Sequence, residues 1–263
     1  MAIKLYWHRG AGRADSRRQN FGDYLSPLIV EAVSGRAVKY ASLREADLMA
    51  IGTILANEHK AKRFGFRRRI HIWGSGCGQP CERFSERHYY HAVRGSETLQ
   101  RIAGAASTPA LGDPGLLAEM LVKRPAGKQY KIGFVPHYVD HDNPSSVAFA
   151  AIEGVHLISV FNEPLEVLRQ IAACEFIVSS SLHGLVVADA YGVPNVRVRL
   201  SEGLVDELKF DDYYSAFGLR AQKLLSADGL KPLAEDFEAF GESYSRPGLS
   251  DIQENLIKNF PKF

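Results

Sequence analysis

The stretch between residues 175 and 194, EFIVSSSLHGLVVADAYGVP, constrains the fold more than any other part of the sequence. Its first five residues, Glu175–Ser179, form the short apolar run of a buried strand. After three serines, Leu182–Tyr191 has the spacing of a helix with one apolar face, formed by Leu182, Leu185, Val186 and Ala190. Because a strand that passes directly into a helix is the unit of parallel sheets, the segment predicts an α/β fold.

The same alternation occurs on both sides of a linker expected at Leu121–Gln129 (LVKRPAGKQ). Before it, strands are expected at 3–7, 46–51, 69–73 and 88–93, and helices at 23–33 and 95–102. After it, strands are expected at 130–135, 156–159 and 195–198, and a helix at 164–173. The periodicity therefore predicts two α/β domains, residues 1–122 and 130–245. Residues 246–263 then form a terminal helix, amphipathic over Ser250–Phe260, that packs across the domain boundary.

Charge and cysteine content exclude several classes of protein. The net charge is only +2, but residues 1–100 hold 17 Lys and Arg against 9 Asp and Glu, so the basic half favours an anionic partner. The cysteines are Cys77, Cys81 and Cys174, and C-x3-C spacing with an odd count predicts reduced thiols and no metal site. The N-terminus has no apolar region typical of a signal peptide, and no window is long and apolar enough for a membrane span. We expect a cytoplasmic protein.

Two strand-to-helix junctions carry candidate chemistry. Ser180 or Ser181 is a natural N-cap for the helix that follows, and His183 falls in its first turn. The free N–H groups and dipole of such a helix start favour an anion, although a capped helix with a packed histidine explains the same residues. Asp23, in the segment NFGD, is either a plain helix cap or a carboxylate placed for acid–base work.

Two further segments are weaker signals. The loop Gly74-x-Gly76-x-Gly78 lacks the residues of a phosphate-binding motif and is equally explained by a tight turn. In Lys60–Arg69 (KAKRFGFRRR) six of ten residues are basic, with two phenylalanines between them. That pattern suits a solvated loop, a nucleic acid, or an anionic membrane surface contacted through Arg67, Arg68 and Arg69.

Six motifs in order resemble the polysaccharide pyruvyl transferase family, in particular its short exopolysaccharide members of the xanthan ketal type. The resemblance covers about residues 18–218. The motifs are NFGD (20–23), AVRG (92–95), GDPGLL (112–117), VPHY (135–138), SSSLHGLVVADAYGVP (179–194) and KFDDYY (209–214).

The resemblance implies two Rossmann-like domains in a GT-B-like arrangement, with the acceptor on the basic N-terminal side. It implies phosphoenolpyruvate as donor, no cofactor, and a terminal sugar of a lipid-linked oligosaccharide as acceptor, met at the membrane's cytoplasmic face. Nucleic acid is not an expected partner. By motif, donor binding falls to Arg94, Leu182 and His183, and the anion-binding helix start adds Ser180 and Ser181. Other members carry an arginine at the position of Ser181, so Arg9, Arg13 or a serine N–H group must replace it here.

Ketal formation needs an acid, a base and anion stabilisation. We expect His183 to be the acid, Asp23 the base on the acceptor hydroxyl, and His137 the reserve candidate. Asp212 and Tyr213 are expected to shape the acceptor side. Two alternatives stay open: a nucleotide-sugar glycosyltransferase of the same architecture, and a non-catalytic protein that binds anionic surfaces.

Overall fold

A computed structural model describes residues 2–10, 20–63, 66–104, 108–203, 205–220 and 224–263. Within these residues the chain forms two parallel sheets and one antiparallel hairpin, β4 (Lys62–Arg63) with β5 (Phe66–Arg67). The expected α/β fold with parallel sheets is confirmed. The strands of the first sheet, in spatial order β2-β1-β3-β6-β7-β8, are β2 (Val38–Tyr40), β1 (Ile3–Tyr6), β3 (Leu48–Met49), β6 (His71–Trp73), β7 (Tyr89–Val93) and β8 (Ala110–Leu111).

The second sheet repeats the connectivity of the first. Its strands, in spatial order, are β10 (Val155–Leu157), β9 (Tyr130–Val135), β11 (Cys174–Ser179), β12 (Asn195–Val198) and β13 (Leu224–Leu225). In both sheets the first strand in sequence lies inside, with its successor on one side and all later strands on the other. The order therefore reverses between β1 and β3 and again between β9 and β11, and doubly wound sheets bind ligands beyond the carboxyl ends of strands at such a point.

Helix α1 (Phe21–Ser34) begins and ends at residues readable from the sequence. Asn20 is the N-cap, and its side chain accepts a hydrogen bond from the Gly22 N–H at 3.2 Å. Gly35 ends the helix at φ 64°, a left-handed conformation that glycine adopts without strain. Asp23 is therefore not the cap, and its carboxylate in the first turn remains available for other work.

Helix α5 (Leu182–Ala190) differs from the amphipathic helix that the sequence predicted. Each of its residues is buried, because the short 3₁₀ helix η2 (Pro114–Met120) covers the side turned away from β11 and β12. Ser181 is the N-cap residue but makes no side-chain capping bond. The Ser179 hydroxyl instead donates to the carbonyl oxygens of Val135 and Ser181, at 2.7 and 2.9 Å.

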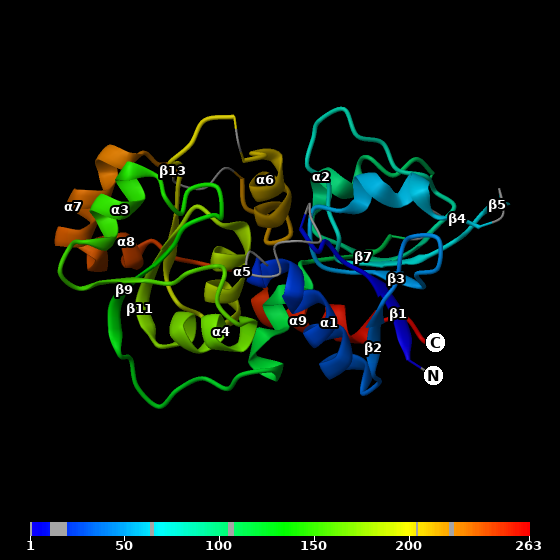
Figure 1. The fold of residues 1–263 in the computed structure, drawn as a ribbon, viewed down its shortest axis with the longest axis horizontal. Coiled ribbons are helices and arrows are strands. Elements are labelled where there is room, and N and C mark those ends of the chain that lie inside the picture. The colour runs from blue at the N-terminus through cyan, green and yellow to red at the C-terminus, as the bar shows by residue number, and fades with distance from the viewer. Residues whose placement is uncertain (1, 11–19, 64–65, 105–107, 204, 221–223) are drawn as a thin grey trace.

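One apolar cluster runs through both halves of the molecule. It joins Leu5 and Phe21 of the first half to Leu116 of η2 and to Leu185 and Val186 of α5. Figure 1 shows the consequence: α5 and α6 (Leu208–Ser215) face α1 and α2 (Ser96–Leu99) across the middle of the molecule. The domain limits at 122 and 130 stay predictions, whereas the absence of any helix or strand in 121–129 agrees with a linker there.

The predicted terminal helix is present as α9 (Leu249–Lys258) and packs against β8 and η2. The indole Nε1 of Trp73 donates to the Leu256 carbonyl at 2.9 Å, and Gln253 donates to the Leu116 carbonyl at 2.8 Å. The chain reaches α9 from α8 (Phe237–Glu242), which packs on β11 and β12, so its last segment returns to the first sheet.

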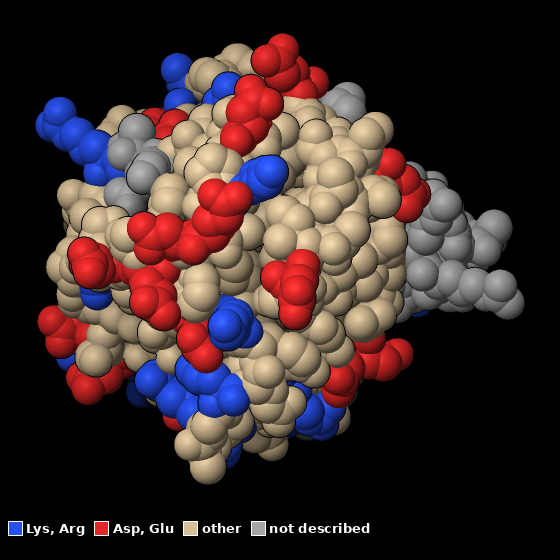
Figure 2. Space-filling model, turned by 90° about the vertical axis from the view of Figure 1, so that its left-hand side faces the viewer, with Lys and Arg blue, Asp and Glu red and all other residues tan. Residues whose placement is uncertain are grey.

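The outer layer of the second half is acidic. Figure 2 shows carboxylate side chains spread over the face that carries α3, α7 and α8. This agrees with the excess of Asp and Glu after residue 100. The remaining helices are η1 (Leu55–Lys60), α3 (Pro144–Ala150), α4 (Pro164–Ala172), η3 (Ala227–Gly229), α7 (Leu230–Glu235) and α8 (Phe237–Glu242).

Candidate functional site

The carboxyl ends of both sheets meet at the centre of the molecule. From the first half come Asp23 at the start of α1, Thr53 after β3 and Arg94 after β7. From the second half come His137 after β9 and the serines after β11 that lead into α5. Both reversal points of strand order therefore contribute residues to one region.

His183 is the residue on which the two halves converge. It is 7% exposed, and its ring lies against the backbone of Gly22, where an added Cβ would approach the ring closer than 3.0 Å. On the other edge, Nε2 lies 3.8 Å from Asp113 Oδ2 and makes no hydrogen bond. Burial, together with the charges of Lys209, Arg94 and His137, lowers the pKa of His183 to about 3, so its imidazole is neutral in the free protein.

Lys209, at the start of α6, is the cation that sequence reasoning missed. Its ammonium makes no ion pair within the described residues and lies 5.4 Å from the centre of the Phe210 ring. Burial, followed by the charge of Arg94, lowers its pKa to about 8. Lys209 is the first residue of the motif KFDDYY, but a lysine beside acidic residues on a helix is typical of an ordinary surface position.

Asp23 and His137 have pKa values shifted toward neutral forms. Burial raises the pKa of Asp23 to about 7, against the lowering effect of Lys209. Burial and the charge of Lys209 lower the pKa of His137 to about 3. The structure thus brings three candidate acid–base groups, His183, Asp23 and His137, within electrostatic reach of one lysine.

Arg94 and Asp212 form a buried ion pair, which changes the expected role of each. Both side chains are fully buried, and Arg94 Nε donates to Asp212 Oδ2 at 3.0 Å. Arg94 also donates to Thr53 Oγ1 at 2.9 Å and to the Cys77 carbonyl, while Asp212 accepts from the N–H and hydroxyl of Thr98 at 2.8 and 2.7 Å. Asp212 therefore has no carboxylate oxygen free for an acceptor sugar. Three of the five guanidinium N–H groups of Arg94 are engaged with protein partners, which leaves two for a donor, and donor binding by Arg94 stays a prediction.

Tyr213 also lies away from any substrate-facing surface. It is fully buried, and its hydroxyl donates to Asp189 Oδ2 at 2.6 Å, as does Arg246 Nε at 2.7 Å. We therefore correct the expectation for both acceptor-side residues. Asp212 and Tyr213 hold α6 against the rest of the protein, and this positions Lys209 at the start of the same helix.

The serines before α5 are buried and take different partners. The Ser180 hydroxyl accepts from the His137 N–H at 2.8 Å and donates to Asp140 Oδ2 at 2.6 Å, which fixes the loop after β9. The Ser181 N–H donates to Ser179 Oγ at 3.0 Å. Leu182 is 3% exposed and belongs to the apolar core, so its side chain is not an anion ligand.

The glycine loop after β6 is a structural turn. Gly74 has φ +89°, and an added Cβ at Gly76 would collide with the Arg94 guanidinium. The loop carbonyl and N–H of Cys77 are occupied by Arg94 and by Thr98 Oγ1, the latter at 2.8 Å. The loop shapes the pocket for a guanidinium and not for a phosphate.

The arginines of the basic stretch Lys60–Arg69 lie in different environments, and so does Arg9, a candidate to replace the missing arginine. Arg68 donates to the carbonyl oxygens of Arg44 and Ala46, at 2.8 and 3.3 Å, whereas Arg69 is exposed with its guanidinium 5.6 Å from the Tyr89 ring centre. Arg68 is therefore only partly exposed, which does not fit a solvated loop or a membrane-facing residue at that position. Phe64 and Arg13 lie outside the described residues, as does the side chain of Arg67, and Arg9 lies over the Tyr40 ring at 4.8 Å.

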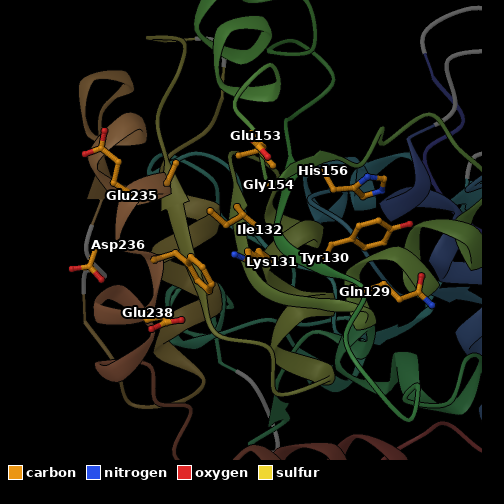
Figure 3. A pocket seen from close by; sticks show the side chains of 13 residues that line it. Gln129, Tyr130, Lys131, Ile132, Glu153, Gly154, His156, Glu235, Asp236 and Glu238 are labelled. Carbon is orange, nitrogen blue, oxygen red and sulfur yellow. The ribbon is translucent and has the colours of Figure 1, made fainter.

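The described residues also form hollows outside this cluster, and two of them are large. One of about 440 Å³ is lined by Tyr6, Tyr40, Ser42, Leu43, Arg44, His59 and Lys60. Burial raises the pKa of Tyr6, and so do the nearby Tyr40 and Asp23, which links this hollow to the central site. The other, of about 770 Å³, lies at the amino ends of β9 and β10, which is the end of the second sheet opposite to the candidate site (Figure 3).

The described residues contain no group of three or more His, Cys, Asp or Glu side chains that could hold a metal ion. Among the helices they form, none is long and apolar enough to cross a bilayer. The central arrangement offers His183 at the start of α5, Lys209 at the start of α6 and His137 after β9, with Asp23 within electrostatic reach of the lysine. That set can bind an anion and move protons.

Comparison with known proteins defines the class of this protein. Residues 63–202 match the family described as polysaccharide pyruvyl transferase, and the chain belongs to this family. It is similar to the uncharacterised protein L143 of Acanthamoeba polyphaga mimivirus, at 34% identity over 138 residues, which are 49% of this chain and 48% of that protein. It is also similar to the succinoglycan biosynthesis protein ExoV of Rhizobium meliloti (strain 1021), at 28% identity over 212 residues, or 78% of this chain and 64% of ExoV. The chain thus spans between about half and two thirds of the length of these relatives.

Proposed function

We propose that this protein transfers pyruvate from phosphoenolpyruvate, as a ketal, onto a terminal sugar of an exopolysaccharide repeat unit. The observation that carries the proposal is the unpaired ammonium of Lys209 beside the imidazole of His183, at the start of α5. Membership of the family and the similarity to a succinoglycan biosynthesis protein support the substrate class. The two sheets, which meet at their carboxyl ends, support a GT-B-like arrangement.

The reaction needs charge stabilisation and three proton transfers. One sugar hydroxyl adds to C2 of phosphoenolpyruvate while the methylene carbon takes a proton and becomes methyl. Phosphate then leaves, a second hydroxyl closes the ketal, and its proton ends on phosphate. In this proposal Lys209 and the N–H groups at the start of α5 hold the anionic donor, His183 supplies the proton to carbon, and Asp23 accepts the hydroxyl proton. His137 is the reserve acid.

The acceptor would enter from the hollow beside Tyr6 and Tyr40. The hollow combines two tyrosine rings with Arg44 and Lys60, a composition suited to a sugar attached to an anionic diphosphate. Its link to Asp23 through Tyr6 would bring a terminal sugar to the proposed base. With this placement we propose a lipid-linked acceptor that is met at the cytoplasmic face of the membrane, and phosphoenolpyruvate as a donor substrate that acts without a cofactor.

The proposed function is tested by phosphate release from phosphoenolpyruvate in the presence of a panel of aryl hexosides with free 4- and 6-hydroxyls. We expect phosphate and a pyruvylated hexoside in equal amounts, and no release from UDP-glucose. His183→Gln should bind donor in calorimetry yet turn over about 10²–10⁴-fold more slowly. Turnover of His183→Gln within a few-fold of wild type would move the acid role to His137 or Asp23. Release of UDP without use of phosphoenolpyruvate would identify a glycosyltransferase instead.

Membrane contact is tested separately by co-sedimentation with vesicles of anionic phospholipid. Arg69→Ala should weaken binding, because an exposed cation near an anionic surface contributes about 1 kcal/mol. Arg68→Ala is the matched control, since that guanidinium is engaged with backbone carbonyls and its loss should change stability more than binding. Equal binding of wild type and Arg69→Ala would argue against this surface.

A further inference from the structure

A second carboxylate lies at the candidate site with one oxygen unused. Asp113 is fully buried at the start of η2, and its Oδ1 accepts a hydrogen bond from the Gly115 N–H at 2.9 Å. Its Oδ2 has no hydrogen-bond partner, and the ion-pair partner available among the described residues is His183 Nε2 at 3.8 Å. An N-cap role explains one oxygen of Asp113 and leaves the other unexplained.

Orphaned polar atoms in a protein interior are rare because each loses its hydrogen bonds to water. Here two of them, Asp113 Oδ2 and His183 Nε2, face one another about 1 Å beyond hydrogen-bond distance. Both side chains are at least nine-tenths buried, so bulk solvent does not reach either atom.

The imidazole has little freedom to turn away. Gly22 lies against the edge formed by Cβ, Cγ and Nδ1, and any larger residue there would collide with the ring. Nδ1 makes no hydrogen bond within the described residues and is the nitrogen turned toward the start of α1. Among the described residues, the charged and titratable groups that act on the ring are Lys209, Arg94, His137 and Asp113.

We propose that Asp113 is the positioning residue for His183: it holds the proton of the neutral imidazole on Nε2 and thereby presents Nδ1 to the substrate. The catalytic role of this pair rests on the proposed function, whereas the hydrogen bond between Asp113 and His183 does not depend on it. A carboxylate that fixes the tautomer of a histidine determines which nitrogen can exchange a proton with the substrate.

The pairing is tested in the free protein by NMR of ¹⁵N-labelled histidine, with His183→Gln used to assign the His183 signals. We expect the wild-type ring to be protonated on Nε2. In Asp113→Asn the amide oxygen should keep the bond from Gly115, so the amide NH₂ would face Nε2 and move the ring proton to Nδ1. Asparagine is as good an N-cap as aspartate, so the fold should survive. A wild-type ring protonated on Nδ1, or an unchanged tautomer in Asp113→Asn, would overturn the proposal.

Turnover gives a second, separable readout. Asp113→Asn should lower kcat for phosphate release about 10²–10⁴-fold with donor KM changed less than tenfold. The control is Asp142→Asn, at an aspartate whose side chain is 94% exposed, and it should behave as wild type. If kcat falls while the tautomer is unchanged, Asp113 is only a structural cap and the proposal is wrong. If wild type uses no phosphoenolpyruvate, the proposed function fails, and the tautomer measurement still decides whether the pair exists.

Discussion

Replacing Lys209 with methionine should make the free protein more stable and the enzyme less active. The pKa of Lys209 is about 8, against 10.5 for an ordinary lysine, because folding buries its ammonium beside other cations. At pH 7 the ammonium of Lys209 is charged in both states, but its charged form is less stable in the folded protein than in the unfolded chain. The difference in pKa corresponds to at most about 3 kcal/mol, which Lys209→Met would relieve.

The sign of the pH dependence follows from proton counts. Between about pH 8 and 10.5 the unfolded chain binds more protons at this position than the folded chain, so the stability of the wild type rises with pH across that window. The methionine variant lacks this rise. Its advantage over wild type should be full below pH 8 and should vanish toward pH 10.5.

The assay is denaturant unfolding at pH 7 and pH 10, with Lys231→Met, at an exposed lysine of α7, as the control. Donor affinity, measured by calorimetry, should fall roughly tenfold to more than a hundredfold in Lys209→Met, since a charge-assisted contact of about 1.5–3 kcal/mol is lost. The reasoning is refuted if Lys209→Met is less stable at pH 7, or if its stability relative to wild type does not change with pH.

Two further substitutions test the geometry of the site. Gly22→Ala should leave the protein folded but displace the His183 ring and lower the rate of phosphate release. The control is Gly127→Ala, where an added Cβ meets nothing within 4 Å, and it should have no effect. Equal rates for the two variants would contradict the packing of Gly22 against His183. Asp212→Asn should destabilise the protein by about 3–5 kcal/mol in denaturant unfolding, because the buried Arg94 charge loses its partner, and a loss below about 1 kcal/mol would show that the pair is not buried in solution.

The elements that could be predicted from the sequence are those with strong local signals. Strands β9 and β12 have the expected limits, and α1 ends at Gly35 as the glycine predicts. The two-residue strand β8 carries no periodicity of its own and is defined by its pairing with β7, so it was missed. The burial of α5 on all sides depends on η2, which lies far away in sequence, and no local pattern records it.

The site was predicted in part for the same reason. His183 and Asp23 stand at strand-to-helix junctions, which local sequence identifies. The environment of Arg94 is non-local: its guanidinium is taken up by Asp212 and by Thr53 from other elements. Lys209 was missed because its importance comes from burial beside distant cations, a property that no motif contains.

The titratable groups at the centre of the molecule all have pKa values shifted by burial, and these shifts affect the first proton transfer of the proposed reaction. Burial moves each toward its neutral form: the pKa values of His183 and His137 fall to about 3, that of Lys209 falls to about 8, and that of Asp23 rises to about 7. A neutral imidazole cannot protonate carbon. A donor that brings a phosphate and a carboxylate raises the pKa of every nearby cation, because opposite charge favours the protonated form. In the proposed reaction the bound donor raises the pKa of His183, and this favours the protonated imidazole that delivers a proton to carbon. Without the donor, the low-dielectric interior strongly disfavours a buried imidazolium next to Lys209 and Arg94.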